Sequence, residues 1–163
     1  MKRLVLMRHA KSSWDDPLVE DHDRPLNGRG RVSARVLGDW LRARKYVPDQ
    51  LLSSSALRTR ETFSRLGFVC DAQFKKALYL ADPQVMMDAL RGAKGETVLM
   101  LGHYPGIAWF AQNIVQVPPP HPRFFDYPTC ATLVAEFDVT DWHEIGTGSG
   151  RAVDFVIPRE LTG

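Results

Sequence analysis

The chain has 163 residues, of which 44% are hydrophobic and 25% are charged. This length suits one ordinary domain, and the composition is that of globular proteins, so it excludes a largely disordered chain. The apolar runs, such as residues 98–101, are too short to span a bilayer. Twenty-one Lys and Arg against 19 Asp and Glu give a net charge of +2, which indicates neither a nucleic-acid tail nor an acidic interaction domain.

The cysteines and the N-terminus bear on the compartment. Cys70 and Cys130 are too few for a disulfide framework, so we expect a reducing, cytoplasmic environment. The N-terminus begins with basic residues and a short apolar run at 4–7, which Arg8 ends. A secretory signal needs about 7–15 apolar residues. We therefore predict a buried first strand over residues 2–8 and no targeting segment.

A helix is predicted over residues 28–46. Apolar residues recur there at the spacing of a buried helical face, and Asn27 stands where an N-cap is expected. The predicted buried face consists of Val32, Val36, Leu37, Trp40 and Leu41.

Further elements follow in alternation after Pro48. We predict a short strand at 50–53, a second helix at 56–66 and an extended piece at 74–80. Asp82 is the predicted cap of a third helix with Pro83 at its first position, a common helix start.

The C-terminal part is predicted to be rich in strands. The unbroken apolar run at 97–101 is typical of a strand covered on both faces, and a fourth helix starts near Pro105. The proline-rich segment 118–122 can be neither helix nor central strand, which predicts a stiff loop. Alternating patterns at 131–138 and 151–157 predict a hairpin at a sheet edge. The whole pattern predicts the α/β class with a mainly parallel sheet and an antiparallel edge.

Basic side chains follow three of the predicted strands, at the edge where such sheets bind ligands. An Arg-His pair follows the first strand, an arginine comes shortly after the second, and a histidine follows the strand at 97–101. With their neighbours in the first loop, these residues are Arg8, His9, Lys11, Ser12, Arg58 and His103. Together with the backbone amides of a helix start, they form a set of anion binders that suits a phosphate group.

Histidine is the nucleophile that this set favours. Neither cysteine stands beside these residues, and Ser12 has no adjacent acidic partner in the pattern. A histidine can attack phosphorus through an unprotonated ring nitrogen when a carbonyl or side chain holds the proton on the other nitrogen. The planar forks of Arg8 and Arg58 can bind phosphate oxygens and stabilise the charge of the moving phosphoryl group.

Four short motifs, in this order, resemble those of the histidine phosphatase superfamily, which includes the cofactor-dependent phosphoglycerate mutases. Residues 6–15 resemble its Arg-His-Gly-Glu-Ser-x-Trp-Asn opening, and residues 26–30 resemble its Leu-Thr-x-x-Gly. Residues 54–62 are similar to its Ser-x-x-x-Arg-x-x-x-Thr, and residues 102–103 match its late Gly-His. The Arg-His-Ala-Lys-Ser version and the short length look most like the SixA-type branch of phosphohistidine phosphatases.

The resemblance implies a fold and a set of roles. The fold is a three-layer α/β/α sandwich of the phosphoglycerate mutase-like kind, as a single domain over residues 1–163. His9 is the nucleophile that becomes phosphohistidine, Arg8 and Arg58 bind the phosphate, and His103 stabilises negative charge on the phosphoryl oxygens. The implied reaction takes two in-line steps, in which water resolves the phosphoenzyme, and needs neither a metal nor a cofactor.

The chain departs from the family pattern at two points. Asp15 stands where the mutases carry Asn, so it is either a proton donor in the phosphate-binding set or a loop residue, and we favour the loop residue. The region after the second helix lacks the Glu that larger members use as general acid, and Asp82 is better explained there as a helix cap. A missing acid suits leaving groups that need little protonation, such as those of phosphohistidine and other phosphoramidates.

Three assignments stay open between a functional and a structural role. Arg24 is either a further phosphate contact or a residue of a surface salt bridge, and Lys11 either binds phosphate or faces solvent. The loop at 118–122 either rims the pocket or is a stiff connector whose neighbouring aromatic residues lie in the core, which is the interpretation we favour.

The favoured function is a metal-independent phosphatase that acts through a phosphohistidine intermediate, on protein phosphohistidine or another activated phosphate. The alternatives are a phosphatase of a small phosphorylated metabolite, a catalytically idle module that binds a phosphorylated ligand, and a divalent-metal enzyme. The metal would use the acidic cluster Asp15, Asp16, Asp21, His22 and Asp23. The expected partner is a phosphorylated substrate such as a phosphohistidine-bearing protein, with no nucleic acid and no membrane, and we expect a monomer.

Overall fold

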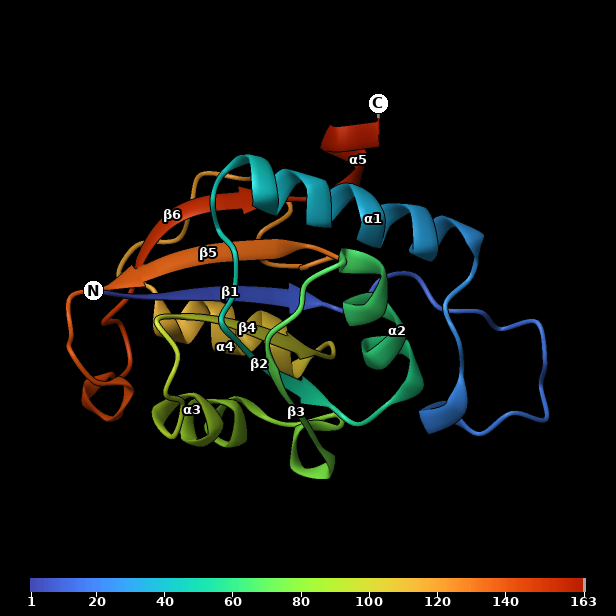
Figure 1. Cartoon of the computed structure of the whole chain (residues 1–163), viewed down its shortest axis with the longest axis horizontal. Coiled ribbons are helices and arrows are strands. Elements are labelled where there is room, and N and C mark those ends of the chain that lie inside the picture. The colour runs from blue at the N-terminus through green and yellow to red at the C-terminus, as the bar shows by residue number, and fades with distance from the viewer. Residues whose placement is uncertain (163) are drawn as a thin grey trace.

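The computed structural model describes residues 1–162, which form one six-stranded sheet with helices on both faces (Figure 1). The strands are β1 (Lys2–Arg8), β2 (Gln50–Ser54), β3 (Asp71–Lys75), β4 (Thr97–Gly102), β5 (Thr132–Phe137) and β6 (Arg151–Val156). The α-helices are α1 (Gly28–Ala43), α2 (Leu57–Leu66), α3 (Pro83–Arg91), α4 (Gly106–Ile114) and α5 (Pro158–Thr162). Short 3-10 helices are η1 (Asp21–Asp23), η2 (Lys76–Leu78) and η3 (Trp142–Glu144). Gly163, the last residue of the predicted domain, lies outside the described residues.

The sheet has the order β3-β2-β4-β1-β5-β6, which makes β1 and β4 its central strands. β4 pairs in parallel with both β1 and β2, and β2 pairs in parallel with β3. β5 runs against β1, and β6 pairs antiparallel with β5. The predicted α/β class, with a mainly parallel sheet and an antiparallel hairpin at one edge, is confirmed.

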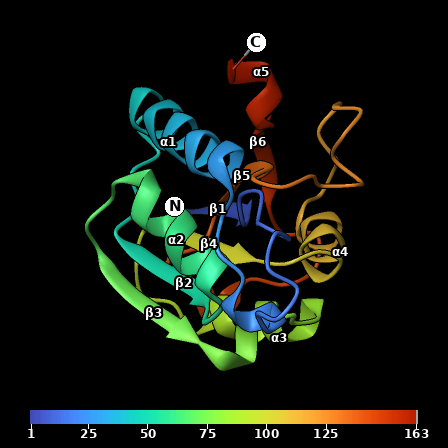
Figure 2. The ribbon, with the colours of Figure 1, turned by 90° about the vertical axis from the view of Figure 1, so that its right-hand side faces the viewer.

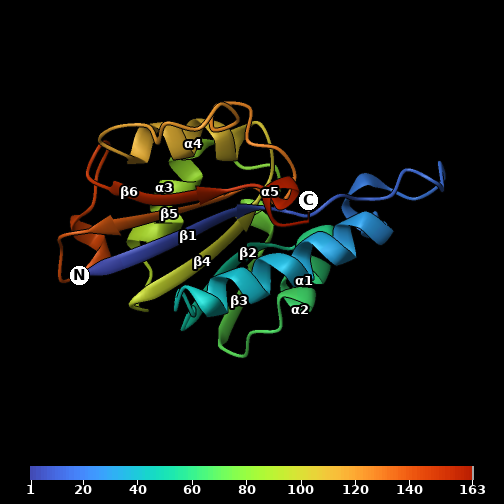
Figure 3. The same cartoon turned by 90° about the horizontal axis from the view of Figure 1, so that it is seen from above.

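Two buried clusters fill the space on either side of the sheet. Because successive side chains of a strand point to opposite faces, β1 contributes to both. Leu4 and Leu6 pack with residues of α3 and α4, whereas Val5 and Met7 pack with residues of α1 and α2. Figure 3 shows the sheet between these two helix pairs, and Figure 2 faces the edge where β1, β2 and β4 end. The three-layer sandwich is therefore confirmed as well.

The predicted caps hold, whereas one strand and one helix face differ from the prediction. Asn27 accepts from Gly30 N at 2.8 Å, and Asp82 accepts from Val85 N at 3.1 Å. The extended piece predicted at 74–80 is instead β3, which starts earlier and is followed by η2. β3 is an edge strand of mostly exposed residues, so it lacks the apolar run of a buried strand.

The buried face of α1 contains Leu37 and Leu41, as predicted, together with small residues that were not predicted. Val32, predicted to be buried, is 52% exposed, while Gly30, Ala34 and Gly38 are buried along one side of the helix. A Cβ at position 30 would lie 2.1 Å from the carbonyl oxygen of Lys11, which is closer than atoms can approach. Gly30 thus lets the start of α1 touch the loop that follows β1, a physical reason for a glycine in the motif at 26–30.

Residues 9–27 connect β1 to α1 and extend beyond the carboxyl edge of the sheet (Figure 3). Within residues 1–162, no helix is long and apolar enough to cross a membrane.

We expect Gly30→Ala to lower the free energy of unfolding by about 1–3 kcal/mol, because either α1 or the Lys11 loop must move to admit the methyl group. Urea denaturation measures this difference. The matched control is Gly28→Ala in the same helical turn, whose added Cβ would meet only an Arg31 side-chain atom, at 3.7 Å. The control should be as stable as the wild type or more stable. An equal loss in both variants would contradict the close-contact explanation.

Candidate active site

The carboxyl ends of β1, β2 and β4 bring the predicted site residues together. In the β1–β4 pairing Arg8 lies opposite Gly102, so His9 and His103 leave neighbouring strands at the same level, and their ring centroids are 5.3 Å apart. Arg58 lies in the first turn of α2, shortly after β2. A cavity of about 390 Å³ at this edge is lined by predicted residues Arg8, His9, Lys11, Ser12, Arg24, Arg58 and His103.

The His9 ring has a defined tautomer. Its Nδ1 lies 2.7 Å from the carbonyl oxygen of Ala10. A carbonyl oxygen can only accept, so Nδ1 carries the proton and Nε2 keeps its lone pair. Burial, and to a smaller extent the nearby charges of Arg58 and Arg8, lowers the pKa of His9 well below its ordinary value. His9 is therefore a neutral imidazole with a free nitrogen, as the sequence analysis requires of a nucleophile.

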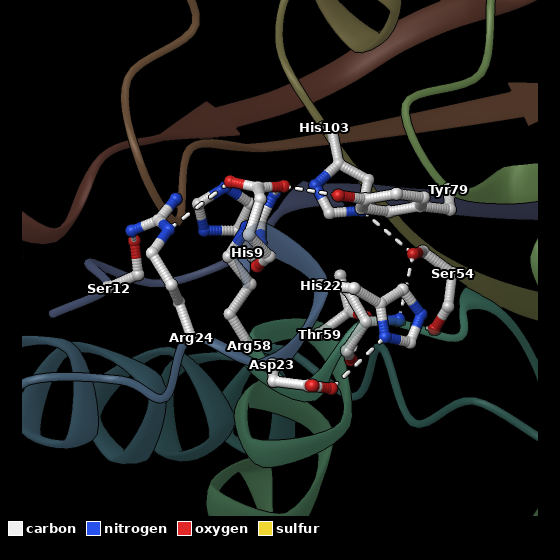
Figure 4. Close-up of polar contacts among 12 residues, drawn as sticks. His9, Ser12, His22, Asp23, Arg24, Ser54, Arg58, Thr59, Tyr79 and His103 are labelled. Atoms are coloured by element: carbon white, nitrogen blue, oxygen red, sulfur yellow. Dashed lines mark hydrogen bonds and ion pairs between the residues drawn. The ribbon is translucent and has the colours of Figure 1, made fainter. Parts of the chain in front are cut away.

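His103 is also held neutral. Burial, and next the charge of Arg58, lowers its pKa to about 3. Its Nε2 lies 2.8 Å from the hydroxyl oxygen of Ser54, which also accepts from Ala56 N at 3.1 Å. Figure 4 shows the other ring nitrogen of His103 facing away from Ser54, on the side of His9. The ring thus presents a buried polar atom to its histidine neighbour.

The two arginines of the set carry buried nitrogens without partners. Within residues 1–162, the buried side-chain nitrogen and oxygen atoms that lack a hydrogen-bond partner are Arg8 Nε, Arg58 Nε and His103 Nδ1. All three belong to residues that line the same cavity. Buried polar groups are nearly always hydrogen-bonded, so a cluster of unpaired ones indicates a site built for a polar ligand. Two guanidinium groups in this cluster suit an anion.

The motif at 54–62 has a role for each of its three marked residues. Ser54 contacts His103, and Arg58 lines the cavity. The Thr62 hydroxyl accepts from Ala10 N at 3.0 Å and donates to the carbonyl of Arg58 at 2.7 Å. The motif therefore links the end of β2 to the residue that follows β4, and links α2 to the loop that carries His9.

Arg24 is part of the cavity wall. It is 7% exposed, so the interpretation as a surface residue is wrong. Its guanidinium donates to the Ser12 hydroxyl at 2.6 Å, pairs with Asp21 at 3.2 Å and lies 3.5 Å from the ring centroid of Trp14. Ser12 thus serves as a partner of Arg24, while the exposed Lys11 lines the rim.

Asp15 lies in the loop outside the cavity, which agrees with the favoured interpretation as a loop residue. It is exposed, its backbone N–H bonds to the Ser13 hydroxyl within the loop, and it is not among the residues that line the cavity. The carboxylate that lines the cavity is Asp21. Burial raises the pKa of Asp21, but hydrogen bonds from Tyr79 and Arg58 outweigh this and lower it to about 2. Asp21 is therefore ionised at neutral pH.

Within the described part of the chain, the acidic cluster does not form a metal site, and the proline-rich loop and the cysteines are not part of the cavity lining. Among residues 1–162, no three His, Cys, Asp or Glu side chains gather in a metal-binding group, so the acidic cluster of the loop does not assemble as one. Residues 118–121 of the proline-rich loop line a separate cavity of about 470 Å³ beside β6. Phe124 and Tyr127 lie in the core, as the connector interpretation predicts, whereas Phe125, also expected there, is 56% exposed. Cys130 is buried and Cys70 half-buried, both as free thiols.

The sequence analysis missed part of the cavity lining. These residues are Trp14, Leu80, Tyr104 and Thr129, and Asp21 was predicted only as a member of the acidic cluster. Tyr104 directly follows His103, and its ring lies 5.2 Å from the Arg8 guanidinium, so its position in the chain was a usable signal. Leu80 and Thr129 come from segments whose local sequence carries no sign of a site.

Comparisons with known proteins agree on the family. The family model of the histidine phosphatase superfamily (branch 1) matches residues 4–79. Uncharacterized protein Rv1276c of Mycobacterium tuberculosis is 31% identical over 160 residues, which cover 94% of this chain and all of the relative. A structure assigned as phosphohistidine phosphatase SixA from Nakamurella multipartitia has a TM-score of 0.84 at 25% identity, covering 96% of each chain. Another so assigned, from Agrobacterium tumefaciens, has a TM-score of 0.79 at 26% identity, covering 96% of this chain and 98% of its own.

The chain belongs to the histidine phosphatase superfamily and has the fold of its SixA-type members. This membership supports phosphatase activity.

We expect Thr62→Val to destabilise the fold by about 1–3 kcal/mol, because the isosteric valine leaves the buried N–H of Ala10 without an acceptor. Chemical denaturation measures the loss. The control is Thr59→Val, in the same helix and equally buried, whose hydroxyl bonds only to carbonyls at 54 and 56. If amide exchange at Ala10 were the same in both variants, Thr62 would not be the anchor of the His9 loop.

Acid should weaken the fold partly through His103. With a pKa of about 3 in the folded protein and 6.5 ordinarily, this ring takes up a proton in the unfolded chain but not in the native one below about pH 6.5. The contribution of this ring to the free energy of unfolding is therefore complete above about pH 6.5 and is lost as the pH falls toward 3. Between about pH 7 and 4.5, we expect His103→Asn to lose about 2 kcal/mol less stability than the wild type, measured in phosphate-free buffer. Parallel losses in the two proteins would refute the assignment.

Proposed function

We propose that the protein is a metal-independent phosphatase that transfers a phosphoryl group first to His9 and then to water. The observation that carries this proposal is the bond between His9 Nδ1 and the Ala10 carbonyl. It leaves Nε2 unprotonated in a cavity that Arg8 and Arg58 also line. A neutral ring beside two guanidinium groups combines a nucleophile with binding groups for the phosphate oxygens.

In the first step, the lone pair of His9 Nε2 attacks phosphorus, and the bond between phosphorus and the leaving group breaks with its electron pair on the leaving group. Arg8 and Arg58 donate N–H groups to the phosphoryl oxygens. In the second step, a water oxygen attacks the phosphorus of phosphohistidine, the pair of the P–N bond returns to Nε2, and the water proton passes to phosphate or solvent.

His103 is proposed as a neutral donor in both steps. If the Ser54 hydroxyl donates to Nε2, the single proton of the neutral ring stays on Nδ1, the buried atom without a partner. That N–H can bind a phosphoryl oxygen as charge develops on it. Ser54 then acts as a positioning residue, because it selects the tautomer of His103.

The substrate class depends on how much protonation the leaving group needs. The carboxyl group among the described cavity residues is Asp21, whose pKa of about 2 makes it a poor proton donor at neutral pH. Substrates whose leaving group needs little protonation fit this site best. We therefore favour protein phosphohistidine or another activated phosphate, in line with the SixA assignment of two structural neighbours. A small phosphorylated metabolite is the alternative substrate, and a cytoplasmic, monomeric protein remains our expectation.

Labelling with radioactive phosphoramidate tests the nucleophile. The wild type should take up acid-labile, base-stable phosphate, whereas His9→Ala should take up none and lose at least about 10³-fold in turnover, because no other group replaces the attacking nitrogen. His143→Ala, which removes an exposed histidine far from the cavity lining, should label like the wild type.

Two results would count against the proposal. Labelling of His9→Ala at the wild-type level would place the phosphoryl group elsewhere. Tight binding of phosphate by a wild type that turns over neither phosphoramidates nor phosphomonoesters would favour the idle binding module.

A further inference from the structure

Asp21 bonds to the two arginines that line this part of the cavity. Its carboxylate pairs with Arg58 Nη2 at 3.0 Å and with Arg24 Nε at 3.2 Å, and it accepts a hydrogen bond from the Tyr79 hydroxyl. Its backbone carbonyl accepts from Arg58 Nη1 at 2.7 Å. Figure 4 shows Arg24, Arg58 and Tyr79 around this part of the site. Both terminal nitrogens of Arg58 therefore already bond to one residue.

This arrangement has a physical reason. Arg58 is 3% exposed, and a buried guanidinium without an anion would be strongly unfavourable. Asp21 supplies the missing negative charge from the loop at 9–27. The carboxylate oxygens of Asp21 accept hydrogen bonds from guanidinium groups, as phosphoryl oxygens also do. Two anions at the same guanidinium would repel each other. A bound phosphoryl group and the Asp21 carboxylate are thus competitors.

The segment that carries Asp21 is held mainly by polar contacts, among them a hydrogen bond between His22 Nε2 and the Ser55 hydroxyl at 2.9 Å. The Asp21 side chain is 45% exposed although its partner Arg58 is nearly enclosed, so water is within reach of the carboxylate. None of the three residues of η1 is buried. Moving this short helix outward therefore breaks polar contacts but uncovers little apolar surface.

We propose that Asp21 is an internal stand-in for the phosphoryl group, which holds Arg58 and Arg24 in the free protein and is released when a phosphoryl dianion binds. This inference rests on the proposed function and deepens it. A ligand must outcompete a carboxylate that is already in place, so Asp21 acts as a specificity-determining residue that favours the doubly charged phosphoryl group over singly charged anions.

Titration calorimetry with inorganic phosphate tests the proposal directly. At about pH 8 the ligand is mainly a dianion, and Asp21→Asn should bind it about tenfold more tightly than the wild type, because the neutral amide no longer competes for the arginines. Tyr79→Phe, which keeps the ring but removes one bond to the carboxylate, should show a smaller gain of about two- to threefold. Asp23→Asn is the matched control in the same short helix. The Asp23 side chain is 68% exposed, lies 3.5 Å from His22 Nδ1 and is not part of the cavity lining, so this variant should bind like the wild type.

The possible results distinguish a failure of the stand-in role of Asp21 from a failure of the proposed phosphatase function. Equal or weaker binding by Asp21→Asn and by Tyr79→Phe, with normal binding and labelling of the wild type, would show that Asp21 only positions the arginines and would overturn the stand-in role alone. A wild type and variants that all fail to bind phosphate would overturn the proposed function and this inference together. If Asp21→Asn does not fold, Tyr79→Phe still decides between tighter and unchanged binding.

Discussion

A positive charge enclosed by protein must be matched by a negative one, and Arg58 imposes this requirement on the whole site. The guanidinium sits at the start of α2, where water barely reaches it. Its field contributes to the lowered pKa values of His9, His103 and Asp21. Burial is the larger cause of the lowered pKa values of the two imidazoles, and Arg58 adds to it. Together they keep both rings neutral, the state in which a histidine can attack phosphorus.

The sheet and the loops contribute differently to this site. His9 and His103 leave the ends of two strands whose residues are almost all buried, so their spacing is set by close packing on both faces. The segment with Asp21, by contrast, is held by ion pairs and hydrogen bonds of Asp21 and by the hydrogen bond between His22 and the Ser55 hydroxyl. The two histidine rings are thus held rigidly, whereas the Asp21 carboxylate beside them lies in a segment with few apolar contacts. This combination suits a site that binds a charged group and later releases it.

Much of the fold could be predicted because its signals are local. The apolar runs of β1 and β4, the Asn27 and Asp82 caps and the proline-rich loop all follow from a few adjacent residues. β3 was misplaced because an exposed edge strand needs no apolar run. On α1, Leu37 and Leu41 were predicted correctly, but the buried glycines were missed because they carry no hydrophobic signal. Within the site, the four motif residues were found, while Asp21 was assigned to the wrong cluster. Its partners Arg58 and Tyr79 lie 37 and 58 residues away, and no local pattern records such a contact.

The register of β1 against β4 carries one more consequence. Arg8 faces Gly102 across the pair, and His9 N donates to the Gly102 carbonyl at 3.1 Å. A slip of one residue would turn every side chain of β4 to the opposite face, so Val98 and Met100 would leave their cluster at the moment His103 left the cavity. The relative position of the two rings therefore depends on the same packing that stabilises the core. Any chain that reaches the native fold also has its two histidines side by side. Changes in ligand preference are then expected in the surrounding loops, which do not affect this register.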